Sequence, residues 1–215
     1  MSIRIKSLTL GPFATNAYLV ADTETNNAIL IDPVDDAPAI LGAAEVEGWS
    51  IKLMLATHAH LDHVLASAAI KEALQIPFLI HEDCEALLDE IPLQGMYFGL
   101  GKLPQPAAPD RLLTDGDSVA LDSIRLQCLF TPGHAPGHLS FYLAEHKILF
   151  SGDSLFAGSI GRTDLPGGDH NLLMNSIVEK LMALDDDVRV LPGHMGATTI
   201  GRERLTNPFI LSYRS

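Results

Sequence analysis

The sequence is poor in cysteine, and this shortage excludes one kind of metal site. Its 215 residues include two cysteines, Cys84 and Cys128, and no Cys-x-x-Cys pair. A structural zinc site built from thiolates is therefore excluded. Since Cys128 stands in an alternating apolar run, we expect a buried thiol there rather than a disulfide.

Basic residues and long apolar runs are also scarce. The chain has 14 Lys and Arg against 27 Asp and Glu, and a formal net charge of -13. Nucleic-acid binders need clustered basic residues, so neither DNA nor RNA is expected as a partner. The apolar runs are far shorter than the roughly 18 residues of a membrane span. The N-terminus lacks the pattern of a signal peptide. We expect no membrane partner and a cytoplasmic location.

The remaining composition is that of an ordinary globular protein, with 47% hydrophobic and 19% charged residues. The length predicts a single domain over 1–215. Alternating or short apolar runs predict strands, and longer patterns with capping residues predict helices, with Asp35 and Asp36 as candidate N-cap residues of the first helix. The predicted strands are 17–20, 28–31, 52–56, 78–80, 124–130, 139–143, 147–150 and 188–191. The predicted helices are 35–48, 63–74, 83–89 and 171–184, with 91–110 irregular. This order indicates an α/β or α+β layered domain.

One short segment concentrates groups that bind metals. Thr57-His58-Ala59-His60-Leu61-Asp62-His63 follows a predicted buried strand. Residues i and i+2 of an extended segment point the same way, so His58 and His60 can bind one ion together. Asp62 and His63 lie where the chain turns into a helix, and they can serve a second ion.

Three further candidate ligands each follow a predicted strand. They are His134, Asp153 and His194, and a glycine stands directly before each one. Glycine lets the backbone turn sharply and bring the next side chain into a pocket. Loops at strand ends are where a rigid scaffold displays catalytic groups. We therefore expect these side chains to join the first cluster.

The types of ligand narrow the choice of metal. Five imidazoles and two carboxylates without a thiolate suit Zn, Fe or Mn better than Ca or Mg. They are enough for two divalent ions, with Asp153 as the natural bridge and zinc as the first expectation. Two such ions outweigh the two carboxylates and a hydroxide, so the site should attract a small anionic substrate. Metal binding lowers the pKa of water to about 7, which provides a nucleophile near neutral pH.

These residues resemble the metallo-β-lactamase superfamily. The His-x-His-x-Asp-His signature is present at 58–63, and the later His, Asp and His follow in the right order. The stretches 131–138, 150–153 and 161–164 are similar to glyoxalase II-like hydrolases, especially short bacterial ones. The resemblance implies a four-layer αββα sandwich. It also implies one metal on His58, His60 and His134, a second on Asp62, His63 and His194, and Asp153 as the bridge.

The activity that the resemblance implies is thioester hydrolysis. A metal-bound hydroxide, held with Asp62 and Asp153, would attack an S-2-hydroxyacyl glutathione such as S-lactoylglutathione. Longer glyoxalase II enzymes hold glutathione with a C-terminal helical region. This sequence ends soon after His194. We therefore expect a glutathione site that is incomplete, differently built or absent.

Two other activities stay open within the superfamily. Persulfide dioxygenases share the Gly-Arg-Thr-Asp stretch and bind one iron through two histidines and an aspartate, here His58, His134 and Asp153. A lactonase or β-lactamase is the further alternative among the hydrolases. A non-catalytic binding module would be expected to lack at least one ligand, and this sequence has them all.

Other residues have more than one interpretation. Arg162 pairs either with a substrate carboxylate or with neighbouring Asp164. His138 either orients His134 or its metal, or simply begins a strand. The segment 96–100 forms a lid, a buried loop or a subunit contact.

Overall fold

The computed structural model describes residues 3–213. It divides into two compact units. The first comprises the residues up to 113 together with 120–124, and the second comprises 114–119 together with 125 onward. Among the described residues, no helix is both long and apolar enough to span a membrane. The single domain over 1–215 stays a prediction.

The first unit contains a six-stranded mixed sheet. Its strands follow chain order across the sheet: β1 (Ile3–Leu10), β2 (Thr15–Asp22), β3 (Asn27–Ile31), β4 (Ser50–Leu55), β5 (Phe78–His81) and β6 (Arg111–Leu113). Neighbours from β1 to β3 are antiparallel, whereas those from β3 to β6 are parallel. Parallel neighbours need crossover connections, and helices supply them. The helices are α1 (Ala37–Glu47), α2 (Leu61–Val64), α3 (Ser67–Leu74) and α4 (Glu85–Tyr97).

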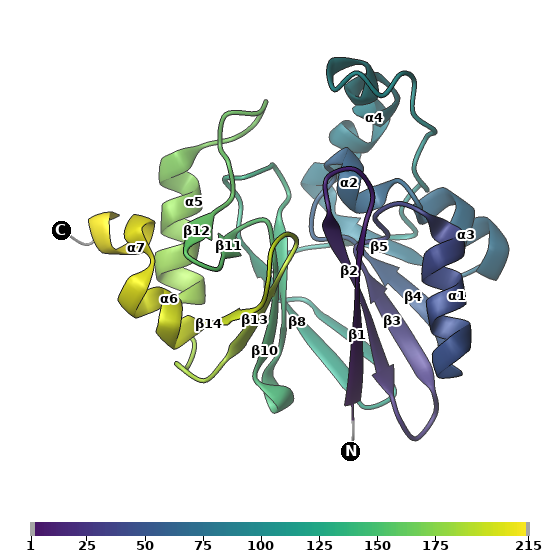
Figure 1. Cartoon of the computed structure of the whole chain (residues 1–215), viewed down its shortest axis with the longest axis horizontal. Helices are drawn as coiled ribbons and strands as arrows, with labels where there is room; N and C mark the ends of the chain where they lie inside the picture. The colour runs from purple at the N-terminus through teal and green to yellow at the C-terminus, as the bar shows by residue number, and fades with distance from the viewer. Residues whose placement is uncertain (1–2, 214–215) are drawn as a thin grey trace. The chain divides into compact units, whose positions relative to one another are not determined.

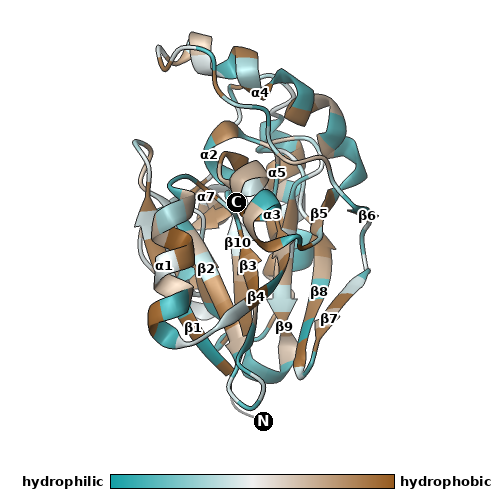
Figure 2. Cartoon of the chain, turned by 90° about the vertical axis from the view of Figure 1, so that its right-hand side faces the viewer, coloured by the Kyte–Doolittle hydropathy of each residue, from teal (hydrophilic) through white to brown (hydrophobic). Residues whose placement is uncertain are grey.

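The core of the first unit lies between its sheet and its helices. α1 and α3 cover one face of the sheet (Figure 1), and the hydrophobic colour follows strands β2 to β4 behind them (Figure 2). Asp36 begins α1 by accepting a hydrogen bond from Ala39, as the sequence predicts. The tryptophan at 49, after α1, is 7% exposed. The guanidinium of Arg4 lies 5.4 Å from the centre of its ring.

The predicted helix 63–74 is two helices in the structure, α2 and α3. The amide of Ala66 does not continue the α2 ladder. It donates to the carbonyls of Pro33 and Val34, each at 3.0 Å. A contact from a distant part of the chain therefore ends α2 and lets α3 begin in a new direction.

The helix predicted at 83–89 is longer than expected, and this prediction is wrong at its C-terminal end. α4 continues to Tyr97 and has Pro92 in its interior. Proline has no N–H and leaves the carbonyl four residues earlier without its helical donor. Here that carbonyl belongs to Leu88, and the side-chain amide of Gln105 donates to it at 2.9 Å.

The second six-stranded sheet has the strand order β14-β13-β10-β9-β8-β7. These are β14 (Thr198–Thr199), β13 (Arg189–Pro192), β10 (Ile148–Gly152), β9 (Leu139–Leu143), β8 (Ile124–Phe130) and β7 (Ser118–Leu121). A small hairpin, β11 (Leu155–Phe156) and β12 (Ser159–Ile160), stands apart from this sheet. α5 (His170–Ser176), α6 (Ile200–Thr206) and α7 (Pro208–Tyr213) cover one face (Figure 1).

The predicted helix 171–184 changes type part-way along. After α5 the chain forms a π-helix over Ile177–Leu181, in which the amide of Met182 bonds to the carbonyl of Ile177 at 2.8 Å. Its apolar residues pack in the core of the second unit. The expectation of a buried thiol at Cys128 is confirmed, since Cys84 and Cys128 are both buried and neither forms a disulfide.

Candidate metal centre

The parallel strands of the first unit bring the histidine cluster to one edge of the sheet. Ile31 at the end of β3 pairs with Leu55 at the end of β4. The segments that follow both strands therefore leave the sheet at the same edge. In open α/β sheets this carboxyl edge is where ligands bind. His58 follows β4 there, and Asp32 follows β3.

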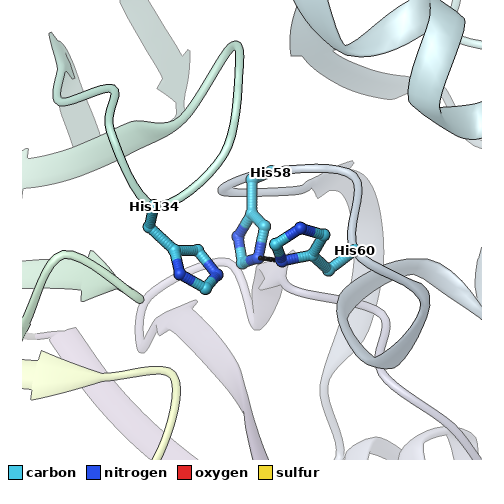
Figure 3. A group of neighbouring side chains, drawn as sticks. All are labelled: His58, His60 and His134. Carbon is cyan, nitrogen blue, oxygen red and sulfur yellow. Dashed lines mark hydrogen bonds between the residues drawn. The ribbon is translucent and has the colours of Figure 1, made fainter. Parts of the chain in front are cut away.

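The predicted ligands of the first unit lie close together. Nε2 of His58 is 3.0 Å from Nδ1 of His60, and Figure 3 shows the two rings nearly at right angles. The ring centres of His58 and His63 are 4.1 Å apart. His58 and His63 are fully buried. The local sequence thus gathers three imidazoles at one point.

Asp62 completes this cluster on α2. Its Oδ2 lies 3.6 Å from Nε2 of His63 and accepts a hydrogen bond from the Thr15 hydroxyl at 2.7 Å. Thr15 begins β2 and is itself buried. The carboxylate is therefore held on the side of the histidines by a strand that is distant in sequence.

Asp32 is a residue of this site that the sequence analysis missed. Its buried carboxylate accepts from the amide of Thr57 at 2.7 Å and from the Thr57 hydroxyl at 3.0 Å. Its Oδ2 also lies 2.9 Å from Nδ1 of His63. With the proton on Nδ1 directed to the carboxylate, Nε2 of His63 keeps its lone pair for a ligand. The signal was present, because Asp32 directly follows the predicted strand 28–31.

In the second unit, the pairing of β10 with β13 shifts register just before Asp153. β10 and β13 are parallel, with Phe150 opposite Leu191 and Gly152 opposite Pro192. The extra residue between these pairs is a β-bulge, a device that re-aims the following side chain. Asp153 leaves β10 and His194 leaves β13 at the same edge, as the sequence predicts.

The Asp153 carboxylate is the meeting point of the second unit's ligands. Its Oδ2 lies 3.5 Å from Nε2 of His134 and 3.3 Å from Nε2 of His194. His134 follows β8 and is drawn on its loop in Figure 3. Its other ring nitrogen, Nδ1, is 2.8 Å from the carbonyl oxygen of Arg162. Both histidines therefore direct Nε2 toward one carboxylate oxygen.

His138 lies behind Asp153. The backbone N–H of Asp153 donates to Nε2 of His138 at 3.0 Å. Nδ1 of His138 must then carry the proton, and it lies 2.9 Å from the hydroxyl of Thr131. His138 is fully buried. It contacts the backbone of Asp153, and its role in orienting His134 or its metal stays a prediction.

Two glycines are required for this close packing. A Cβ on Gly133, whose φ is +123°, would overlap the backbone of Leu173. A Cβ on Gly161 would overlap the carbonyl oxygen of Asp153 and come within 3.1 Å of Nδ1 of His134. Any larger residue at either position would displace the ligand loops.

Arg162 forms the ion pair that the sequence allowed for. Its Nε and Nη2 donate to the two carboxylate oxygens of Asp164, each at 2.7 Å. This pair lowers the pKa of Asp164 to about 2, chiefly through the hydrogen bond from Arg162. The Arg162 side chain is 56% exposed. A contact with substrate stays a prediction.

The segment 96–100 is not a buried loop, and that alternative is wrong. Met96 is 63% and Tyr97 is 89% exposed. Phe98 makes an edge-to-face contact with Phe13 in the turn between β1 and β2, with ring centres 5.8 Å apart. Thr15, which binds Asp62, lies only two residues beyond Phe13. The lid and the subunit contact stay open for this segment.

The donors in each unit are of the types that bind transition metals. Each unit presents imidazole nitrogens beside a carboxylate at the edge of a sheet. Imidazole and carboxylate together suit Zn, Fe or Mn. The partners behind the ligands, Asp32 and the Arg162 carbonyl, set which ring nitrogen is available.

Comparison with known proteins decides the family. The Metallo-beta-lactamase superfamily matches residues 10–194. The chain belongs to the metallo-β-lactamase superfamily. Proteins of this superfamily bind divalent metal ions.

Two relatives carry names that describe an activity. Hydroxyacylglutathione hydrolase GloC of Haemophilus influenzae is 38% identical over 212 residues, which cover 98% of this chain and 99% of that protein. The human mitochondrial persulfide dioxygenase ETHE1 is 30% identical over 199 residues, which cover 90% of this chain and 70% of that protein. The chain is similar to both, so the family alone does not select one reaction.

Solved structures confirm the predicted fold class. The B3 metallo-β-lactamase BLEG-1 matches with a TM-score of 0.91 and 37% identity, covering 96% of this chain and 99% of that one. TTHA1623, in a di-iron-bound form, matches with a TM-score of 0.86 and 42% identity, covering 95% of this chain and 99% of that one. The mixed α/β chain with its two sheets therefore has the metallo-β-lactamase fold.

Proposed function

We propose that the chain is a two-metal hydrolase that cleaves thioesters between 2-hydroxy acids and glutathione. One observation carries the proposal. The complete set of histidine and aspartate ligands occurs in a chain 38% identical to a hydroxyacylglutathione hydrolase over 99% of that protein. That match also extends over 98% of this chain.

The proposed metal centre has the ligands that the family resemblance implies. His58, His60 and His134 would hold one divalent ion, and Asp62, His63 and His194 would hold the other. Asp153 would bridge them. Its role is supported by Oδ2, which lies within 3.5 Å of Nε2 of both His134 and His194. Zinc is the expected metal, and iron and manganese suit the same donors.

A metal pair, when bound, lowers the pKa of water and so supplies a nucleophile near neutral pH. The chain's own residues orient the reacting groups. Asp62 is fixed by Thr15, and Asp153 is fixed through its backbone by His138. Their carboxylates are therefore positioned to accept a hydrogen bond from the nucleophile and aim it at the thioester carbonyl.

The leaving group makes few demands on the protein. A thiolate leaves without a strong general acid, because free thiols have a pKa of only about 8.5. The exposed guanidinium of Arg162 is a candidate to bind a substrate carboxylate, in exchange with Asp164. An anionic substrate would also be attracted by the positive charge of the metals.

A persulfide dioxygenase is the second candidate. It is supported by 30% identity to the human enzyme. It is also supported by ETHE1 from Myxococcus xanthus, whose structure matches with a TM-score of 0.80 and 27% identity, covering 95% of this chain and 83% of that one. As a persulfide dioxygenase, the chain would hold one iron through His58, His134 and Asp153. Lactone or β-lactam hydrolysis is the further alternative among the hydrolases, supported by the likeness to BLEG-1.

The test is an anaerobic assay of the metal-loaded protein for thiol release from S-lactoylglutathione. We expect rapid release that is lost in His58→Ala and retained in His170→Ala, because His170 is exposed and lies outside the cluster. No release, together with oxygen uptake on glutathione persulfide, would replace the hydrolase by the dioxygenase. Turnover of a lactone or β-lactam alone would retain the two-metal hydrolase and change its substrate.

A further inference from the structure

A buried carboxylate in the second unit has no part in the proposed reaction. Glu203 on α6 is fully buried. Its Oε1 accepts from the Thr198 hydroxyl at 2.5 Å. Its Oε2 accepts from the backbone N–H of Gly158 at 2.8 Å and from the side-chain amide of Asn207 at 2.9 Å. Burying a carboxylate is costly unless its oxygens are bonded, and here both of them are.

Asn207 extends this network to the turn of the β11–β12 hairpin. Its Nδ2 also donates to the carbonyl of Ser159 at 3.0 Å, and its Oδ1 accepts from the amide of Phe209 at 3.1 Å. The side-chain amide is thus fixed at both ends. Together with Glu203, it holds the N–H of Gly158 and the C=O of Ser159, two adjacent backbone groups.

The hairpin leads directly to the histidine cluster. Two residues after β12, the carbonyl of Arg162 lies 2.8 Å from Nδ1 of His134. Between them, Gly161 packs so tightly that a Cβ would overlap the carbonyl oxygen of Asp153. The segment is therefore tightly packed, and a displacement of the hairpin would also displace His134 and Asp153.

We propose that Glu203 and Asn207 are positioning residues for His134, acting through the β11–β12 hairpin and the carbonyl of Arg162. That carbonyl can only accept, so it selects the tautomer with the proton on Nδ1. Nε2 then keeps its lone pair on the side of Asp153. The inference rests on the proposed function only in taking His134 as a metal ligand.

The test compares network variants with variants of the same helix that leave the network intact. Asn207→Ala removes the donor to Ser159. Glu203→Gln replaces one acceptor oxygen by an NH₂ group that cannot accept from Gly158. Thr198→Val removes a hydroxyl donor at nearly constant volume. Leu205→Ala, at a side chain 75% exposed, and Ile200→Val, in the core, are the controls.

The first measurement is the Nδ1–H signal of His134 in ¹⁵N spectra of the metal-free protein. We expect a slowly exchanging proton in the wild type and in both controls, and loss or rapid exchange of that proton in the network variants. The second measurement is metal affinity by chelator competition. We expect a fall of roughly tenfold in the network variants, the lower end of the usual effect of outer partners.

An unchanged His134 signal and unchanged affinity in all network variants would overturn the inference. It would equally be overturned if Ile200→Val, at matched loss of stability, lowered the affinity as much. If Glu203→Gln does not fold, Asn207→Ala and Thr198→Val decide the matter. Because the tautomer is read without substrate or metal, a wild type that releases no thiol would count against the proposed function alone.

Discussion

The two units contribute their candidate ligands in different ways. The first unit presents His58, His60, Asp62 and His63 within six residues, on one loop and the first turn of α2. The second presents His134, Asp153 and His194 from three loops that are separated by whole strands and helices. The first set is local and the second is assembled by the sheet.

The contacts that orient the ligands also differ between the two units. In the first unit, side chains orient the ligands: Asp32 binds His63, and Thr15 binds Asp62. In the second, a backbone group orients one ligand, since the carbonyl of Arg162 contacts His134, and a side chain supports the other, since His138 accepts from the N–H of Asp153. Side-chain support can be removed by a single substitution. A supporting backbone group cannot be removed in this way. It can be displaced only by substituting residues that position its segment.

The largest expected effect comes from the carboxylate at the centre of the second unit. Asp153→Asn keeps the volume but removes the charge that faces both His134 and His194. Since charge stabilisation by a metal centre amounts to several kcal/mol, we expect thiol release to fall by about 10² to 10³-fold. Asp187→Asn, at an exposed carboxylate of the same unit, is the control. Equal rates for both variants would contradict the bridging role.

His63→Ala tests the local set of the first unit. His63 belongs only to the proposed second ion, so its loss should lower the metal content from two ions per chain toward one. Metal analysis after dialysis measures this. Unchanged stoichiometry would refute the assignment of the second site, whatever the activity of the variant.

Asp32→Asn tests support by a side chain rather than a ligand. The amide can no longer accept from both Thr57 and His63 in the same way, so His63 should lose its fixed tautomer. We expect metal affinity to fall by about 10 to 100-fold, measured by chelator competition. Asp89→Asn on the exposed side of α4 should leave it unchanged. A similar fall in both variants would show a general charge effect instead.

The smallest effect is expected at the opposite end of β2 from Thr15. Asp22 accepts hydrogen bonds from the side chain of Ser123 and from the backbone N–H of Glu24, Thr25 and Ser123, and its pKa is lowered from 3.8 to about 2. A lowered pKa in the folded state stabilises the protein above about pH 4, and that stabilisation is lost as the pH falls through about 2.

Asp22→Asn should therefore lower the free energy of unfolding near neutral pH. The difference in free energy of unfolding between variant and wild type should disappear as the pH falls toward 2. Urea unfolding at a series of pH values measures it, and thiol release at neutral pH should be retained. A gap that stays constant down to pH 2 would show that the carboxylate charge does not matter there.

The parts of the structure that depend on nearby residues could be predicted from the sequence. The strands 139–143 and 78–80 appear as β9 and β5 with nearly the same bounds. The cap at Asp36 is observed, because capping involves only the first turn of the helix. The local histidine cluster and the glycine before each later candidate ligand were equally accessible, since each is a pattern of neighbouring residues.

What could not be predicted depends on contacts between distant segments. α2 ends because Ala66 bonds to Pro33 and Val34. α4 continues through Pro92, where Gln105 binds the carbonyl that proline leaves without a donor. From the sequence alone, Asp32 has the pattern of a turn residue. Its role is seen only in the structure, where the parallel pairing of β3 and β4 places it beside Thr57. In each case the partner is identified only by the folded chain.

Trp49 gives the chain a built-in optical reporter. It is the only tryptophan in the sequence and is nearly buried in the first unit, under the guanidinium of Arg4. Its fluorescence therefore follows the unfolding of that unit, whereas circular dichroism follows both. Coincident transitions would identify one cooperative domain over 1–215, and separate ones would identify two. The same indole provides a way to ask whether adding metal stabilises the half of the molecule that carries His58 to His63.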